Sequence, residues 1–175
     1  MGILKKIVLL VLLSTSLSSY CQILDTIPWA KGRGLTWKDF RAKPKVGSNA
    51  AAVTASGITY SFSSLARGSE VEVEFKVNTF FYPDKSWYKK EVCDDIILSH
   101  EQLHFDISEL FARKFKKRLN ELTFTLKIKE EVRTIYKDIL KELSDFQELY
   151  DWETNFSRDT EKQLEWNKKV AELLE

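Results

Sequence analysis

The sequence predicts an α+β fold, in which a small antiparallel sheet or hairpin packs against one long helix and two further C-terminal helices. Between residues 53 and 82, β-branched and aromatic residues are frequent, and part of this segment alternates apolar and charged side chains as half-buried strands do. From residue 96 onward, apolar residues recur at every third or fourth position, which is typical of helices that bury one face. The length of 175 residues and the 43% hydrophobic content suit one domain with a single core.

The first 21 residues are expected to form a cleaved secretory signal peptide and to take no part in the fold. Lys5 and Lys6 precede an apolar run over residues 7–13, and a segment rich in serine and threonine follows it. This succession is typical of a signal peptide, and the run is too short to span a bilayer comfortably, although an N-terminal anchor is the alternative. We therefore predict one domain over residues 22–175, exported to the periplasm, the outer envelope or the medium, with no stable membrane span.

Composition limits the partners and the covalent links of the mature chain. The net charge of +1 gives no sign of a nucleic-acid surface, so no nucleic-acid partner is expected. The charged fraction of 30% and the aromatic fraction of 13% argue against disorder. Removal of Cys21 with the signal peptide would leave Cys93 alone, without an intramolecular disulfide. Cys93 is interpreted as a small buried residue in a helical context.

Two strands joined by a turn are predicted in the first half of the mature chain. Residues 53–62 are rich in Thr, Ser, Ile and Tyr, which favour strands. Over residues 70–77, valine and phenylalanine alternate strictly with glutamate and lysine, so one face of this strand is expected to be buried and the other exposed. The sequence Arg67-Gly68-Ser69 supplies a turn between the two strands, which predicts a hairpin.

Three helices are predicted in the second half of the chain. The first is expected to begin at a cap supplied by Asp84 or Ser86, and its apolar stripe includes both histidines of the chain. The second covers residues 128–146, where apolar residues keep the three- and four-residue spacing. The last is expected to begin with a capping box formed by Thr160 and Gln163.

The first helix carries an HExxH motif, formed by His100, Glu101, Gln102, Leu103 and His104. Residues four apart lie one turn apart on one helix face, so the two imidazoles can bind one zinc ion. Glu101 lies about 100° around the helix axis, where zinc proteases use a carboxylate as general base for the metal-bound water. The alternative is a pair of half-buried histidines that pack one face of the helix.

The third metal ligand is expected to be a carboxylate. A catalytic zinc ion usually takes three protein ligands and leaves its fourth position to water, and the chain has no third histidine. Asp106 and Glu109 are expected to point elsewhere, since Glu109 lies about 180° around the helix from the first histidine. The candidates are Asp151 and Glu153, in a break expected over residues 150–156 between the last two helices. The alternative is that both only favour the dipole of a nearby helix N-terminus.

Three segments make the chain similar to a known family. They are Leu35 to Phe40 (LTWKDF), His100 to Ile107 (HEQLHFDI) and Tyr150 to Asn155 (YDWETN), with Gln163 and Trp166 downstream. Together they resemble the bacterial domain-of-unknown-function family nine hundred and twenty-two, whose members are exported and are described as predicted zinc-dependent proteases. The resemblance covers nearly all of the mature chain. Its most specific part is the HEQxHFD helix followed by the YDxET segment.

The resemblance implies a zinc site in which the two motif histidines are ligands and Glu101 is the catalytic residue. It also implies a histidine after the YDxETN segment, where this chain has Phe156. A phenyl ring cannot bind zinc. Either Asp151 or Glu153 therefore supplies the third ligand, or the site binds metal weakly, or the chain is a degenerate member of the family.

The leading hypothesis for function is an exported HExxH zinc metallopeptidase that acts on a peptide or protein substrate. In this mechanism zinc polarises the scissile carbonyl, and Glu101 takes a proton from water and passes it to the leaving amine. One alternative is a non-catalytic envelope protein on the same scaffold, with or without metal. Another is a binding module that captures extended peptides in a groove beside the edge of the sheet.

Overall fold

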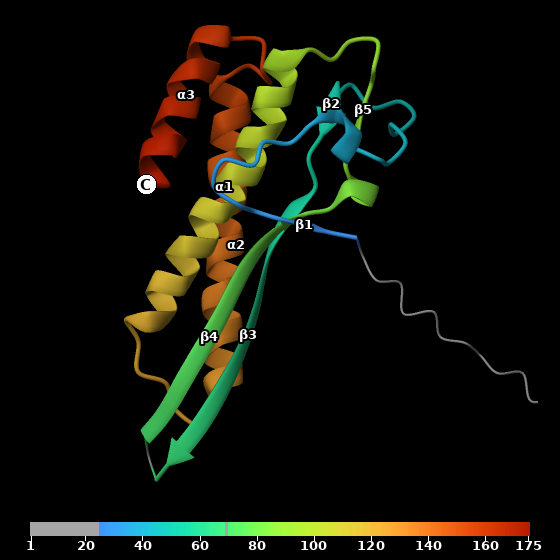
Figure 1. Cartoon of the computed structure of the whole chain (residues 1–175). Helices are drawn as coiled ribbons and strands as arrows, with labels where there is room; N and C mark the ends of the chain where they lie inside the picture. Colours follow the sequence, from blue (N-terminus) through green and yellow to red (C-terminus); the bar gives the residue numbers. More distant parts are fainter. Residues whose placement is uncertain (1–24, 69) are drawn as a thin grey trace, which may run out of the picture.

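A long β-hairpin and three helices dominate the part of the chain that the structure describes, which is residues 25–68 and 70–175 (Figure 1). This computed structural model confirms the predicted α+β fold, with a small antiparallel sheet and a long first helix. The predicted signal peptide, residues 1–21, lies outside the described residues. None of the described helices is both long and apolar enough to cross a membrane.

The hairpin consists of β3 (Ser56–Arg67) and β4 (Glu70–Phe81), which pair antiparallel along their whole length. β1 (Ile27–Pro28) pairs with the other edge of β4, so the three-stranded sheet has the order β1-β4-β3. The predicted hairpin is confirmed, except that Val53 belongs to a separate strand. Gly68 at the turn has a φ of 66°, a left-handed backbone that glycine adopts without steric cost.

The alternation of side chains along β4 separates a core face from a solvent face. The apolar residues of this strand are partly buried and pack against the main core, and they are Val71, Val73, Phe75 and Val77. Glu72, Glu74 and Lys76 between them are exposed. The ring of Phe75 lies 5.7 Å from that of Phe62 on β3 and 5.4 Å from that of Phe124, between centroids. The period-two pattern thus predicts correctly which face of the hairpin meets the helices.

A second sheet of two short strands lies beyond the end of the hairpin (Figure 1). In it, β2 (Ala52–Val53) pairs antiparallel with β5 (Trp87–Tyr88). Cys93 follows β5 and is half-buried, and its thiol donates a hydrogen bond to the carbonyl oxygen of Ala51 at 3.4 Å. The predicted helical setting of Cys93 is therefore wrong, because the first helix begins only at Asp95.

The first helix, α1 (Asp95–Asn120), has 26 residues and begins later than predicted. Its N-cap is Asp94, whose carboxylate accepts a hydrogen bond from the backbone N–H of Ile97 at 2.9 Å. The predicted caps at Asp84 and Ser86 are wrong, since the first lies in a short 3-10 turn and the second directly follows that turn. The physical reason is that Trp87 and Tyr88, which directly follow these residues, pair with β2 as strand β5 and so cannot continue a helix. Helical periodicity does not reveal a pairing between segments so distant in sequence.

The second helix, α2 (Ile128–Glu153), extends through most of the segment in which a break was expected. Its C-terminal half therefore carries Asp151 and Glu153 on a regular helix. The chain turns instead at Asn155, Phe156 and Ser157, which have φ angles of 47°, 54° and 71°. The break is thus real but shorter than residues 150–156, and it consists of three consecutive left-handed residues.

The third helix, α3 (Thr160–Leu173), begins at the N-cap Asp159, whose carboxylate accepts a hydrogen bond from the backbone N–H of Lys162 at 3.0 Å. The predicted capping box of Thr160 and Gln163 is wrong. Gln163 is buried, and its amide faces the first histidine of the motif instead of the helix end. The side chain of Gln163, which the local pattern assigned to a helix cap, instead makes a tertiary contact with His100.

The main core lies between the hairpin and the helices, and α1 is its central element. α1 contacts β3, β4, α2 and α3, and near its N-terminal end it also contacts β2. In Figure 1, α1 and α2 run along one face of the hairpin, and α3 packs beside the N-terminal half of α1. Fully buried residues come from all three helices, and they include Ile107, Phe115, Val132, Ile139 and Val170. The motif residues of α1 thus lie where three helices and β2 meet.

Candidate metal centre

Two histidines and one aspartate bring three ligand atoms together beside α1. His100 and His104 lie one turn apart on α1, and Asp151 comes from the last turn of α2. The Nε2 atoms of the two histidines are 3.2 Å apart, and each lies 3.0 Å from Oδ1 of Asp151. Zinc ligands at the usual bond lengths, arranged tetrahedrally, lie about 3.3 Å from one another. The three atoms are therefore spaced closely enough to hold one metal ion.

The hydrogen bonds around His100 indicate which of its nitrogens carries a proton. Nδ1 of His100 lies 2.9 Å from Oε1 of Gln163, which also accepts a hydrogen bond from the hydroxyl of Tyr150 at 2.8 Å. The amide nitrogen of Gln163 donates to Asn167, so the orientation of the amide is consistent. Nδ1 must then donate its proton to Gln163, and in the neutral ring Nε2 keeps a lone pair.

The lone pair of His100 faces an anion. Nε2 of His100 lies 3.0 Å from a carboxylate oxygen of Asp151, and neither atom of such a pair brings a proton. Burial raises the pKa of the Asp151 carboxyl, but the two histidines, which can donate to this carboxylate when they are protonated, outweigh this effect and hold the pKa below its ordinary value. Asp151 is therefore ionised at neutral pH. A cation between the three atoms would remove the repulsion between the lone pair and the carboxylate.

The ring of Tyr150 packs against both histidines. It stacks on the imidazole of His100, with centroids 4.5 Å apart, and meets that of His104 edge-on at 5.1 Å. Burial raises the pKa of the Tyr150 hydroxyl, so this group stays protonated and acts as a donor. It donates to Gln163 and to the backbone carbonyl of His100. The imidazole of His100 is thus held on one side by a ring and at its far nitrogen by an amide.

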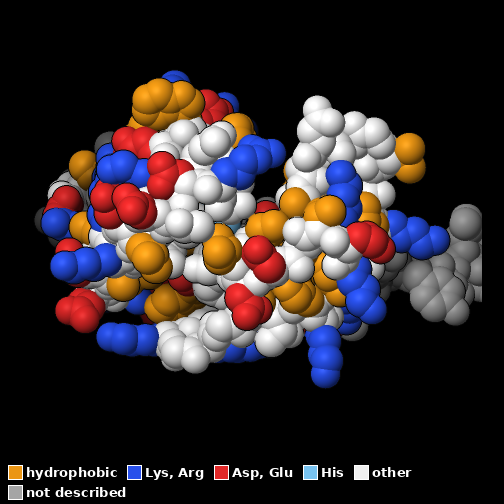
Figure 2. All heavy atoms as spheres, turned by 90° about the horizontal axis from the view of Figure 1, so that it is seen from above, with side chains coloured by type: hydrophobic (Ala, Val, Ile, Leu, Met, Phe, Trp, Pro, Cys, Tyr) orange, Lys and Arg blue, Asp and Glu red, His pale blue; other side chains and the backbone are white. Residues whose placement is uncertain are grey.

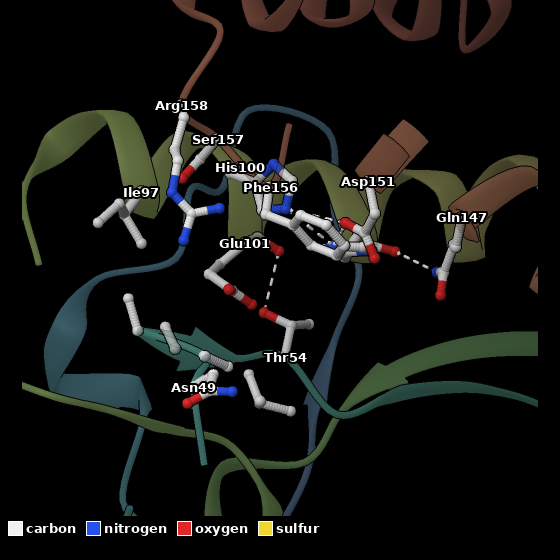
Figure 3. Close-up of a pocket in the computed structure, with 15 residues that line it drawn as sticks. Asn49, Thr54, Ile97, His100, Glu101, Gln147, Asp151, Phe156, Ser157 and Arg158 are labelled. Carbon is white, nitrogen blue, oxygen red and sulfur yellow. Dashed lines mark hydrogen bonds and ion pairs between the residues drawn. The ribbon is translucent and has the colours of Figure 1, made fainter. Parts of the chain in front are cut away.

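Glu101 contributes a buried carboxylate oxygen that has no hydrogen-bond partner among the described residues. This oxygen is Oε2, and the side chain as a whole is buried. Buried polar groups are almost always paired with protein or with ordered water, so this oxygen needs a partner that the chain does not supply. Glu101 lines the same cavity as His100, His104 and Asp151 (Figure 3). A water molecule or a polar group of a ligand in this cavity could pair with it.

The cavity in front of these residues has a volume of about 600 Å³. One wall is formed by the motif residues of α1 and by Asp151, and the opposite wall by residues 49–54, which include β2. The rim is completed by Phe156, Ser157 and Arg158 from the turn after α2. The view from above shows a hollow in the surface between the helices and the part of the molecule that carries β2 and β5 (Figure 2). The candidate site is therefore open to molecules larger than water.

Not every carboxylate considered from the sequence reaches the histidines. Glu153 lies two residues beyond Asp151 on α2, and its Oε2 accepts a hydrogen bond from the indole of Trp166 at 2.8 Å. Asp106 accepts hydrogen bonds from Trp29 and Gln102, and Glu109 accepts one from Thr79. As predicted, Asp106 and Glu109 point away from the histidine pair. The structure brings only Asp151 to it among the described residues.

Phe156, which cannot bind a metal, belongs to the turn after α2 and lines the same cavity as the two histidines. It lies at the rim of the cavity and is 61% exposed. Asp151 offers a third ligand atom beside the two histidine nitrogens, from the helix that precedes position 156. The residues that sequence reasoning missed are Tyr150 and the metal-site role of Gln163. Tyr150 begins the YDWETN segment and Gln163 lies downstream of it, so the family resemblance was the one feature of the sequence that pointed to these two residues.

Comparison with known proteins supports the resemblance. A family model described as "Bacterial protein of unknown function (DUF922)" matches residues 33–158. This range includes the hairpin, all of α1 and α2, and therefore His100, His104 and Asp151. The comparisons with curated proteins and with solved structures returned no match. Because the family model covers more than half of its length, the chain belongs to this family of bacterial proteins of unknown function.

Proposed function

We propose that the protein is an exported zinc-dependent peptidase in which His100, His104 and Asp151 hold the metal ion and Glu101 is the general base. The observation that carries the proposal is the triangle of three ligand atoms, 3.0 to 3.2 Å apart, formed by Nε2 of both histidines and Oδ1 of Asp151. The unpaired Oε2 of Glu101 in the same cavity supports a hydrolytic role.

The donor set fits zinc. Two imidazole nitrogens and one carboxylate oxygen form the three-ligand set of a catalytic zinc site, which leaves one position open. The second nitrogen of His100 is engaged by Gln163, as is usual for histidines that bind metal. Iron(II) can also take two histidines and one carboxylate. The buried and unpartnered Glu101 favours zinc, because hydrolysis needs a base at this place.

The residues of the chain have separate tasks in the proposed reaction. When bound, zinc supplies a Lewis acid that polarises a carbonyl group and lowers the pKa of water. Oε2 of Glu101 accepts a proton from the attacking water and returns it to the leaving amine. Gln163 keeps the proton of His100 on Nδ1, so that Nε2 remains available to the metal. Tyr150 fixes the plane of the same imidazole.

The cavity suits a peptide in extended form. β2 pairs with β5 along one edge, and no other described strand pairs with its second edge. Residues 49–54 line the cavity opposite the metal ligands, so a peptide could lie between β2 and α1. Extended peptides bind free strand edges through main-chain hydrogen bonds. This free edge also supports a second candidate function, which is a peptide-binding module without catalysis.

Replacement of Glu101 separates the two candidate functions. We expect the zinc-loaded parent to cleave peptides from a mixed pool, detected by mass spectrometry. Glu101→Gln should lower turnover by about 100-fold or more, since general base catalysis contributes factors of this size, while the zinc content stays that of the parent. Glu109→Gln is the matched control on the same helix, because the carboxylate of Glu109 is engaged by Thr79 and Arg113. Peptide binding without cleavage by the parent would favour the binding module.

A further inference from the structure

We infer that Arg158 anchors a carboxylate of the peptide substrate, so that the cavity selects peptides with an acidic side chain or a free C-terminus next to the bond that is cleaved. This inference rests on the proposed peptidase function and adds the substrate class. It depends on three observations. The turn before Arg158 is held by backbone hydrogen bonds, the guanidinium of Arg158 lines the cavity, and Arg158 has no acidic partner among the described residues.

The turn before Arg158 is strained and held in place. Asn155, Phe156 and Ser157 all have positive φ angles, although none of them is glycine. Left-handed backbone costs free energy at each such residue, and runs of it persist only where the surrounding structure imposes them. Here the backbone N–H of Phe156 donates to the carbonyl of Asp151 at 2.8 Å, and that of Asp159 donates to Thr154 at 2.9 Å. The turn is thus tied directly to the helical end that carries Asp151.

Arg158 belongs to the lining of the cavity that also contains Glu101. Ile97 and His100 line the cavity as well, and the guanidinium of Arg158 points toward the side of the cavity where Glu101 lies (Figure 3). Arg158 is the only lysine or arginine among the described residues that line this cavity. A substrate group that meets Arg158 would therefore lie beside the bond on which Glu101 acts.

Arg158 has no acidic partner among the described residues. The only hydrogen bond of its side chain there is from Nη1 to the carbonyl oxygen of Asn155, at 3.3 Å, and no carboxylate oxygen lies within ion-pair distance. Arg113 and Arg118, in contrast, each contact a glutamate at 3.0 Å. A guanidinium offers several donors in a planar fork that matches a carboxylate. Most of this donor capacity remains available to a ligand that enters the cavity.

The test compares four short peptides of one sequence that differ only in their carboxylates. One position near the cleaved bond holds Glu or Gln, and the C-terminus is a free acid or an amide. Binding to the zinc-loaded parent is measured by calorimetry, and cleavage separately. We expect at least one carboxylate to improve binding by about tenfold, as charge-assisted hydrogen bonds do. The pair of Glu and Gln peptides tests the side chain, and the pair of acid and amide tests the C-terminus.

Variants of Arg158 show whether the arginine is responsible. Arg158→Gln should remove the preference for the carboxylate by raising KM with little change in kcat, and Arg158→Lys should restore part of it. Arg133→Gln, on an exposed part of α2 away from the cavity, is the matched control. Zinc content should not change in any variant. A carboxylate preference that Arg158→Gln leaves intact would overturn the inference, because the carboxylate would then bind the zinc ion itself.

The outcomes also separate this inference from the proposed function. Cleavage without any difference among the four peptides would overturn the carboxylate anchor and leave the peptidase intact. No zinc binding and no cleavage would overturn the peptidase. If the carboxylate peptides then still bound, and if Arg158→Gln abolished that binding, the anchor would remain as a property of a peptide-binding cavity.

Discussion

The proton on His100 decides what the candidate site can hold. A proton on Nδ1, donated to Gln163, leaves Nε2 free to bind a metal, whereas a proton on Nε2 would block the site. Gln163 in turn is oriented by Tyr150 and Asn167, which engage its oxygen and its nitrogen respectively. A chain of three neutral side chains, Tyr150, Gln163 and Asn167, thus sets the state of one candidate metal ligand.

Replacement of Gln163 tests this dependence. Gln163→Leu removes the acceptor for Nδ1 of His100 and should weaken zinc binding by about 10- to 100-fold, as losses of partners to metal ligands do. Gln147→Leu is the matched control, because the amide of Gln147 contacts only the backbone carbonyl of His104 and the hydroxyl of Ser108. Zinc titration of the three proteins measures the effect. Equal affinities for Gln163→Leu and the parent would show that the amide does not orient the ligand.

At the scale of single elements, the hairpin supports the helix that carries the motif. β4 presents its apolar side to the core and its charged side to solvent, and α1 packs across this apolar side. The strand is only half-buried, so its contribution to stability comes from a few side chains. Phe75 is the largest apolar residue of the alternating run and contacts rings on both sides. The position of α1 therefore depends on residues far from the cavity.

The two faces of β4 should respond differently to truncation. Phe75→Ala should lower the free energy of unfolding by about 3 kcal/mol, because it removes a large apolar side chain from the core face. Glu74→Ala, at the neighbouring exposed position, should change it by less than about 0.5 kcal/mol. Denaturant unfolding of both variants and the parent measures the difference. Similar losses for the two variants would contradict the observed orientation of the strand.

The elements were predictable where one local pattern dominates. Strict alternation located the core face of β4, and the three- and four-residue spacing located the helices. The start of α1 was missed because β5 pairs with β2, which is distant in sequence. The choice between Asp151 and Glu153 was not accessible either. It depends on how far α2 is rotated about its axis relative to α1, and on the helix continuing beyond the break that was expected at residue 150.

At the scale of the whole molecule, the cavity joins segments from most of the chain. Residues 49–54, the N-terminal half of α1, the end of α2 and the following turn all contribute to it. Gln163 on α3 reaches the same site from behind, although α3 lies beyond the residues that the family model matches. The three candidate ligands are therefore brought together by tertiary packing, and the HExxH segment alone supplies only two of them.

The proposed site of action outside the cytoplasm depends on the first 21 residues. The order of lysines, apolar run and polar residues predicts cleavage after Cys21, so the mature protein should begin at or near Gln22. N-terminal sequencing of the protein from fractionated cells that produce the full chain tests this. Exchange of Lys5 and Lys6 for glutamate should slow export, because the charged start of the signal is lost. A protein with intact Met1 in the cytoplasm would contradict the proposed export.

The central claim is that His100, His104 and Asp151 together hold one zinc ion, and titration of the chelator-treated protein with zinc tests it most directly. We predict one tightly bound zinc ion per chain for the parent. Asp151→Ala and His100→Ala should each weaken binding by at least about 100-fold, since loss of a ligand should exceed the 10- to 100-fold cost of losing a ligand's partner. Glu153→Ala, two residues away on the same helix, should bind zinc as the parent does. No zinc uptake by the parent, or equal affinities for Asp151→Ala and Glu153→Ala, would contradict the claim.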